Sequence, residues 1–74
     1  MKLVNGCELY KITDTEYVYY YRSKENYGPW VTVKKSAMGK WYYIRLNDVS
    51  VSDEYEDFEV CINVAYNDMV RSKY

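Results

Sequence analysis

Short runs of alternating apolar and polar residues, separated by turn-forming residues, organise most of this chain. The runs are rich in Tyr, Val, Ile, Trp and Thr, which favour extended strands. The separators fall at Asn5-Gly6, Thr13 to Thr15, Ser23 to Pro29, Ser36 to Gly39 and Ser52 to Asp57. The pattern predicts strands over residues 7–12, 16–22, 30–35, 41–46 and 58–66. Because connections this short join antiparallel neighbours, we expect an all-β fold, a small antiparallel meander or open barrel of about five strands.

The last third of the chain also fits a helix. Apolar residues alternate without a break from Phe58 to Tyr66, as in a strand, and no Gly or Pro interrupts residues 53–74. In a helix, one stripe would instead contain Phe58, Cys61, Ile62, Ala65 and Met69. The β-branched residues and two asparagines weaken a helix, so the strand is the preferred prediction. The alternative is an α+β fold, a four-stranded antiparallel sheet with a C-terminal helix over residues 54–72, whose dipole the flanking charges would suit.

Alternation also divides the residues of the predicted strands 30–35 and 41–46 between two faces. One face would hold the aliphatic core, made of Val31, Val33, Tyr42, Ile44 and Leu46. The other face would carry aromatic and basic side chains, namely Trp30, Thr32, Lys34, Trp41, Tyr43 and Arg45, joined by Tyr19 and Tyr21 from the strand 16–22.

Aromatic rings beside basic side chains suit two kinds of partner. Trp, Tyr and Arg dominate the hot spots of protein interfaces. Stacking on aromatic rings next to Lys or Arg also holds single-stranded nucleic acids. Packing between neighbouring strands would explain the same rings without any partner. The candidate partner-binding residues on this face are Trp30, Trp41, Tyr43 and Arg45.

Charge is segregated along the chain, although the net charge is only −1. Residues 11–45 contain seven basic and three acidic side chains, whereas residues 48–68 contain seven acidic and no basic ones. Five acids and two aromatics fill positions 53–59. Such a stretch can dock on a basic groove, with carboxylates in the places of nucleic-acid phosphates. It can equally be a charged loop or the acidic first turn of a helix, and its candidate partner-binding residues are Asp53, Glu54, Tyr55, Glu56 and Asp57.

The residue inventory argues against catalysis. The 74 residues form one domain, 1–74, with little room for a deep cleft. The absence of histidine removes the commonest general base and metal ligand. The two cysteines form no CxxC motif, and the three glycines form no phosphate-binding loop. We therefore expect no enzyme activity, no catalytic residues, no metal site and no cofactor.

No segment resembles a signal peptide, which needs about 7–15 apolar residues, or a membrane span, which needs about 18. We therefore expect a cytoplasmic protein that does not bind a membrane. Its two cysteines, Cys7 and Cys61, should be reduced and packed as small apolar residues. A Cys7–Cys61 disulfide is the alternative if the chain is exported.

Together these features favour a non-catalytic protein-binding module. Its small size and eleven tyrosines suit the type of accessory inhibitor or regulator that phages and mobile elements direct against a host protein, in the host cytoplasm. The expected partner is a protein, for example one with a basic nucleic-acid-binding groove. The alternative is a single-stranded nucleic-acid-binding protein, which the near-neutral charge disfavours. A third possibility is self-association through the aromatic face.

Overall fold

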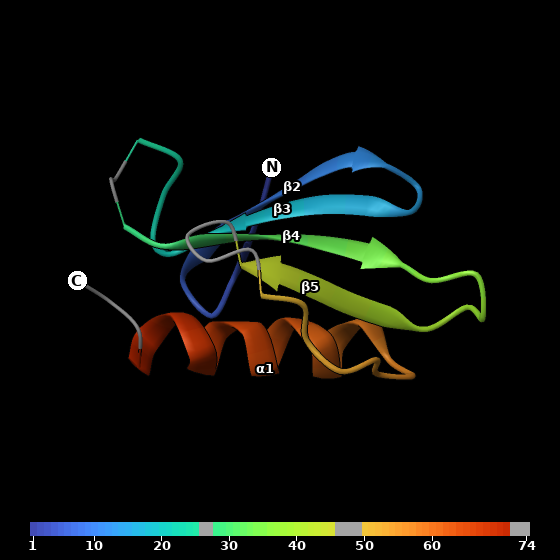
Figure 1. The fold of residues 1–74 in the computed structure, drawn as a ribbon. Coiled ribbons are helices and arrows are strands. Elements are labelled where there is room, and N and C mark those ends of the chain that lie inside the picture. Colours follow the sequence, from blue (N-terminus) through green and yellow to red (C-terminus); the bar gives the residue numbers. More distant parts are fainter. Residues whose placement is uncertain (26–27, 46–49, 72–74) are drawn as a thin grey trace.

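A computed structural model describes residues 1–25, 28–45 and 50–71 of the chain. The strands of this part are β1 (Lys2–Val4), β2 (Cys7–Thr13), β3 (Glu16–Tyr20), β4 (Trp30–Lys35) and β5 (Trp41–Arg45), and the helix is α1 (Phe58–Arg71). The strands form one sheet in the order β1-β2-β3-β4-β5, with every neighbouring pair antiparallel (Figure 1). The predicted antiparallel meander is confirmed, in the α+β form that places a helix at its C-terminal end.

The prediction of a strand over 58–66 is wrong, because this segment forms α1. The helix buries Cys61, Ile62, Ala65 and Met69, which are four of the five residues of the helical stripe. The sheet needs a second layer on its apolar side, and an amphipathic helix supplies one where a further strand would not. Burial of this stripe outweighs the weak helix propensity of the valines and asparagines.

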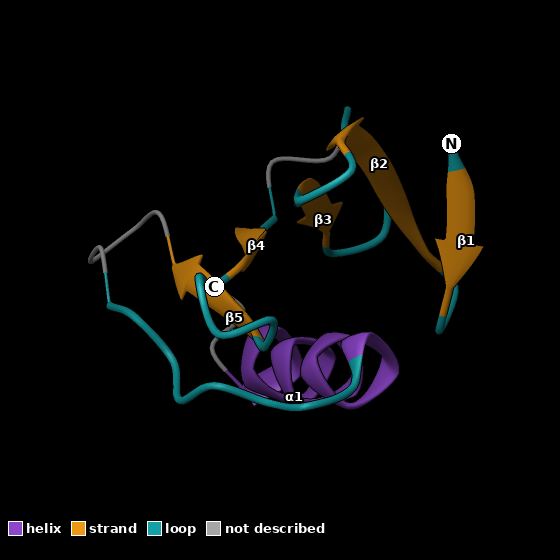
Figure 2. Cartoon of the chain, turned by 90° about the vertical axis from the view of Figure 1, so that its right-hand side faces the viewer, coloured by secondary structure: helices purple, strands orange, loops and turns teal. Residues whose placement is uncertain are grey.

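The helix lies along one side of the sheet, and the sheet arches over it (Figure 2). The core between the two layers consists of Cys7, Leu9, Tyr19, Val31, Val33 and Tyr43 from the strands, with the four buried helix residues. Cys7 and Cys61 are both buried and free, as the sequence predicts. One layer of helix on one layer of sheet is therefore the whole architecture of the described residues.

The first strand was missed by the alternation pattern. Asn5 and Gly6 have φ angles of 55° and 74°, so they form the central residues of a primed hairpin turn between β1 and β2. Asn-Gly is a strong hairpin signal, and a strand on its N-terminal side could have been expected from it. The other strands lie close to their predicted ranges, although β3 ends at Tyr20 rather than 22. The predicted end of the last of these strands, Leu46, lies outside the described residues.

The segment that follows β5 turns back along the outer edge of that strand. The backbone N–H of Trp41 donates to the Tyr55 carbonyl at 2.7 Å, and the N–H of Tyr55 donates to the Trp41 carbonyl at 2.6 Å. A third bond joins the Ser52 N–H to the Tyr43 carbonyl at 2.9 Å. This segment, residues 50–55, therefore covers the β5 edge before the chain enters α1.

Candidate functional site

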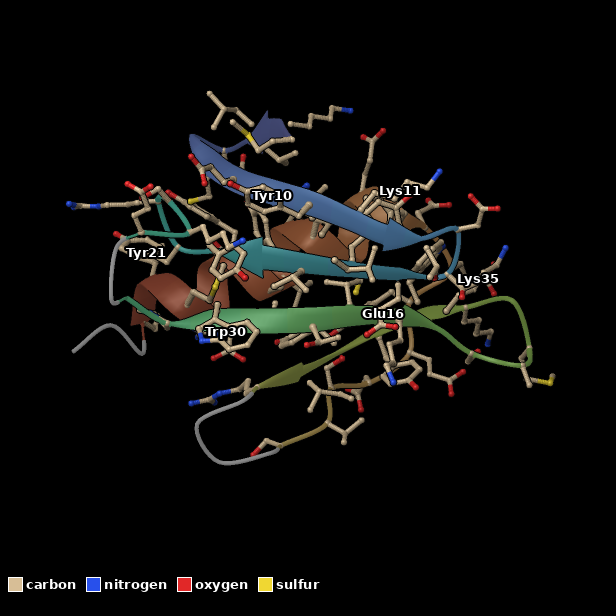
Figure 3. All side chains as sticks on the ribbon, turned by 90° about the horizontal axis from the view of Figure 1, so that it is seen from above. Tyr10, Lys11, Glu16, Tyr21, Trp30 and Lys35 are labelled. Atoms are coloured by element: carbon tan, nitrogen blue, oxygen red, sulfur yellow. The ribbon has the colours of Figure 1, made fainter. Side chains whose placement is uncertain are left out.

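The side of the sheet opposite α1, here called the open face, has no second layer in the described part of the chain. Cross-strand neighbours point to the same side of an antiparallel sheet. Three rows of neighbours alternate with the buried residues and so lie on the open face: Tyr10–Val18–Thr32–Ile44, Tyr20–Trp30 and Glu16–Lys34–Tyr42. Figure 3 looks onto this face, with Tyr10, Glu16 and Trp30 in front of the strands and the helix behind them.

Three aromatic rings from three different strands meet on the open face. The Tyr20 and Trp30 rings are stacked, with centroids 5.4 Å apart and an interplanar angle of 21°. Tyr10 meets Tyr20 edge-on at 5.6 Å. Trp30 is 36% exposed, and the two tyrosines are half-buried by one another. The rings of Tyr10, Tyr20 and Trp30, here called the aromatic cluster, thus form a packed, partly exposed aromatic surface.

A carboxylate on the same face holds one ring of the cluster in place. The Tyr10 hydroxyl donates to Glu8 Oε1 at 2.7 Å, and the backbone N–H of Lys24 donates to the same oxygen at 2.9 Å. These donors lower the pKa of Glu8, the backbone N–H of Lys24 contributing most. The Lys24 ammonium lies 5.6 Å from the Tyr10 ring centroid. Glu8 therefore links the loop after β3 to the edge of the aromatic cluster.

The structure does not bring the predicted aromatic and basic residues onto one face. Trp41, Tyr43 and Arg45 pair with Lys35, Val33 and Val31, so they point toward the helix side. Trp30, with Lys34 and Thr32, points to the open face, and Tyr42 and Ile44 lie beside them instead of in the core. The prediction matched the wrong faces of the two strands, because alternation within a strand does not determine its register with the next.

Trp41 packs against the first residue of the helix instead of forming a free platform. Its ring lies 4.8 Å from Phe58 and 5.9 Å from Tyr17, and the Tyr17 and Phe58 rings are 4.7 Å apart. The Lys35 ammonium approaches the Trp41 ring to 5.7 Å from its centroid. This second group of rings closes the core at the start of α1.

Tyr43 and Arg45 join β5 to the last turns of the helix. The buried Tyr43 donates its hydroxyl proton to Asp68 Oδ2 at 2.9 Å, and Arg45 Nη1 lies 3.3 Å from Asp68 Oδ1. Burial, followed by the hydrogen bond to this carboxylate, raises the pKa of the Tyr43 phenol. Both predicted site residues therefore have structural partners on α1.

Tyr19 and Tyr21, which were expected beside these residues, also lie on the helix side. Tyr19 is fully buried, and its hydroxyl donates to the Val4 carbonyl at 2.6 Å. Burial raises the pKa of the Tyr19 phenol, since the charged form would have no water around it. Tyr21 packs against the edge of the core.

The acidic stretch lies between the β5 edge and the start of the helix. Its carboxylates at 53, 54, 56 and 57 are exposed, whereas Tyr55 is half-buried against the strand. Two of the acids have partners on the β4–β5 turn, since Glu56 lies 3.8 Å from Lys40 and Glu54 accepts from Ser36 at 3.4 Å. Asp57 precedes the helix, and its carbonyl accepts the Cys61 N–H at 3.1 Å. The stretch therefore combines an exposed acidic surface with the N-cap of α1.

Sequence reasoning missed Tyr10 and Tyr20 as members of the candidate surface. Tyr19 and Tyr21 were predicted to lie with Trp30, whereas it is their neighbour Tyr20 that shares its face. The available signal was the two-residue period of Glu8 and Tyr10 in β2, combined with Tyr20 at the end of β3. The pairing of Tyr20 with Trp30 across the strands needed the tertiary structure.

The described residues also lack the features of a metal site and of a membrane-spanning helix. In that part of the chain, no three His, Cys, Asp or Glu side chains gather closely enough to hold a metal ion. No helix in it has both the length and the apolar character to cross a membrane. Searches against protein-family models, curated proteins and solved structures gave no match. The function of this chain must therefore be inferred from its surfaces.

Proposed function

We propose that the chain is a non-catalytic protein-binding module that docks on its partner through the open face. The observation that carries this proposal is the aromatic cluster, in which the rings of Tyr10, Tyr20 and Trp30 pack together on the open face. Tyr and Trp give large contact areas for little conformational entropy, and they are enriched at the centres of protein interfaces. Because the rings already pack together in the free protein, little conformational entropy is lost when a partner binds.

The composition of the rest of the open face supports a protein partner. At its two edges, Leu3 pairs with Glu8 and Val51 pairs with Ile44, and these two apolar residues are 62% and 64% exposed. The charged side chains of the strands on this face are Glu8, Glu16 and Lys34, so that neither sign dominates. Exposed apolar side chains on a surface with little net charge are typical of protein-binding sites.

The acidic stretch extends this surface at the β5 edge. Val51 pairs with Ile44 on the open face, and Asp53 and Glu54 follow it along the same edge. A partner with a concave apolar surface and a basic rim would contact both, because the sheet is convex on this side (Figure 2). An inhibitor or regulator that covers a basic groove fits this description, and two buried free thiols suit the reducing cytoplasm.

The proposal is tested by comparing Trp30→Ser with Met38→Ser in affinity purification and quantitative mass spectrometry. Met38 is 80% exposed on the β4–β5 turn, so its variant removes exposed apolar surface away from the open face. We expect a specific partner to be lost with Trp30→Ser, by at least about 2 kcal/mol or some thirtyfold in affinity, and retained with Met38→Ser. Equal capture by both variants, once both are shown to be folded, would exclude the open face as the docking surface.

A single-stranded nucleic acid is the alternative ligand, favoured by the stacked Tyr20–Trp30 pair with Lys34 on the same face. This alternative predicts that labelled oligonucleotides bind at low salt with a dissociation constant below about 100 μM, the weak end of non-specific affinities, when measured by fluorescence anisotropy. Lys34→Ala would then weaken binding and flatten its salt dependence. Asp53→Lys with Glu54→Lys separates the two ligands, because reversed charge abolishes docking on a basic protein rim but leaves oligonucleotide binding equal or stronger.

A further inference from the structure

The two edges of the sheet differ in the described part of the chain. Residues 50–55 hydrogen-bond along the outer edge of β5, whereas no described segment pairs with the outer edge of β1. Two apolar side chains stand at that edge, Met1 at 72% and Leu3 at 62% exposure, against 36% for Trp30 in the aromatic cluster. An exposed apolar edge is a template for pairing with another strand.

The backbone of Leu3 is oriented to pair outward. Leu3 is the cross-strand neighbour of Glu8, and the Glu8 N–H donates to the Arg22 carbonyl at 3.0 Å on the opposite side of β2. Leu3 and Glu8 therefore form a pair whose backbone groups point away from each other. It follows that Leu3 presents both its N–H and its C=O to the outer edge, which is the arrangement that a residue of an added antiparallel strand requires.

A groove runs between this edge and the first half of α1. Its walls are β1 and the helix, and its apolar lining is Leu3, Val4, Leu9, Phe58 and Ile62. The groove has a volume of about 440 Å³, which lies within the range of about 300–1,000 Å³ that is usual for ligand-binding clefts.

The rim of the groove is polar and more acidic on the helix side. Lys2 and Asn5 lie on the strand side, and Glu59 and Asn63 lie on the helix side. A second hollow continues past Glu59 to Asp57. A ligand that extends along the helix side therefore meets two carboxylates, with the single ammonium of Lys2 on the other wall.

We propose that the β1 edge and this groove form a second binding site, which takes an extended peptide segment of a partner protein by strand addition. The residue opposite Leu3 exchanges two backbone hydrogen bonds with it and lies against its side chain on the open face. The residues before and after it point into the groove, because side chains alternate along a strand. One of these is apolar and fills the lining, and the other is basic and faces Glu59. Edge backbone supplies affinity and the groove supplies selectivity in this mode of recognition.

The test is an NMR titration of the whole chain with the peptide acetyl-Thr-Lys-Val-Ile-Thr-amide, in which the antiparallel direction sets valine opposite Leu3 and lysine opposite Val4, so that the lysine is not paired with Lys2. We expect saturable shifts of the amide resonances of residues 2–4 and 59–63. Replacing the peptide lysine with glutamate, or N-methylating its valine, should each weaken binding about tenfold or more, since one removes the charge match and the other a backbone donor. No saturable shift at these residues up to about 1 mM peptide would overturn the proposal.

Matched variants of the protein separate the backbone and charge contributions. Leu3→Pro removes the outward N–H and should abolish binding, whereas Leu3→Val keeps it and should bind within about threefold of the wild type. Glu59→Lys should weaken the lysine peptide about tenfold and strengthen the glutamate peptide, and Glu54→Lys, equally exposed but outside the groove, should do neither. Binding that survives Leu3→Pro in a folded protein would overturn the proposal. A wild-type dimer in sedimentation equilibrium that Leu3→Pro dissociates would also overturn it, by assigning the edge to a second copy.

Discussion

At the scale of single residues, tyrosine does three different things in this chain. Tyr19 fills the core and gives its hydroxyl proton to a backbone carbonyl, and Tyr43 joins the sheet to Asp68 on the helix. Tyr10 stands on the open face with its hydroxyl on Glu8. A ring that is apolar along its body and polar at its tip can serve all three environments, because each hydroxyl finds an acceptor. The abundance of tyrosine therefore does not by itself identify a binding surface.

Among the tyrosine hydroxyls that bind a carboxylate, the loss of the Tyr43 hydroxyl should lower the free energy of unfolding most. Its acceptor, Asp68, has a side chain that is only 20% exposed, and hydrogen bonds to charged groups contribute about 1.5–3 kcal/mol when buried. Tyr43→Phe should lower the free energy of unfolding by about 1–2 kcal/mol in urea titrations. Tyr10→Phe loses a bond of similar length to Glu8, on the open face and away from the core, and should cost under about 0.5 kcal/mol. Equal losses for the two variants would refute a special role for the Tyr43–Asp68 contact.

At the scale of elements, the residues of α1 fit both the two-residue period of a strand and the 3.6-residue period of a helix, and their surroundings select the helix. Phe58 to Tyr66 alternate as a strand would, yet the stripe that includes Cys61 and Ala65 faces a sheet that needs covering. The valines of the segment lie outside this stripe and remain partly exposed, with Val60 at 45%. The sequence contained both patterns, and only the apolar side of the neighbouring sheet distinguishes them.

Asp57 is expected to stabilise the start of this helix. It occupies the N-cap position, where a short acidic side chain can accept the first unpaired backbone N–H groups and favour the positive end of the dipole. Asp57→Ala should therefore lower stability by about 1 kcal/mol. The control is Glu56→Ala, which loses only a long, exposed contact to Lys40 and should cost less than about 0.5 kcal/mol. A Glu56→Ala loss as large as that of Asp57→Ala, in the same urea titration, would show that Asp57 does not cap the helix.

At the scale of the whole molecule, sheet and helix share one core, so they should open together. Cys7 on β2 and Cys61 on α1 are 2% and 0% exposed within the same cluster. Burial raises the pKa of the Cys61 thiol to about 12, which leaves almost no reactive thiolate at neutral pH. A helix that detached on its own would expose Cys61 while Cys7 stayed protected.

Thiol labelling of the native protein tests this cooperativity. Both cysteines should react only through global unfolding, so the opening free energy measured at each should equal that from urea unfolding. Met38→Cys provides a control thiol on an exposed turn and should react at once. Faster labelling of Cys61 than of Cys7 would show that α1 opens independently of the sheet.

The sequence by itself determined the antiparallel meander and the position of most turns. These depend on local causes: β-branched and aromatic residues favour strands, and Asn, Asp and Gly favour turns. Only the tertiary structure decided the state of residues 58–71 and the faces of the strands, because both depend on contacts between segments distant along the chain. The register of β4 and β5 moved Trp41, Tyr43 and Arg45 to the helix side and left Trp30 with Tyr20 on the open face. A shift of one residue in that register would exchange the two faces, since side chains alternate with a period of two.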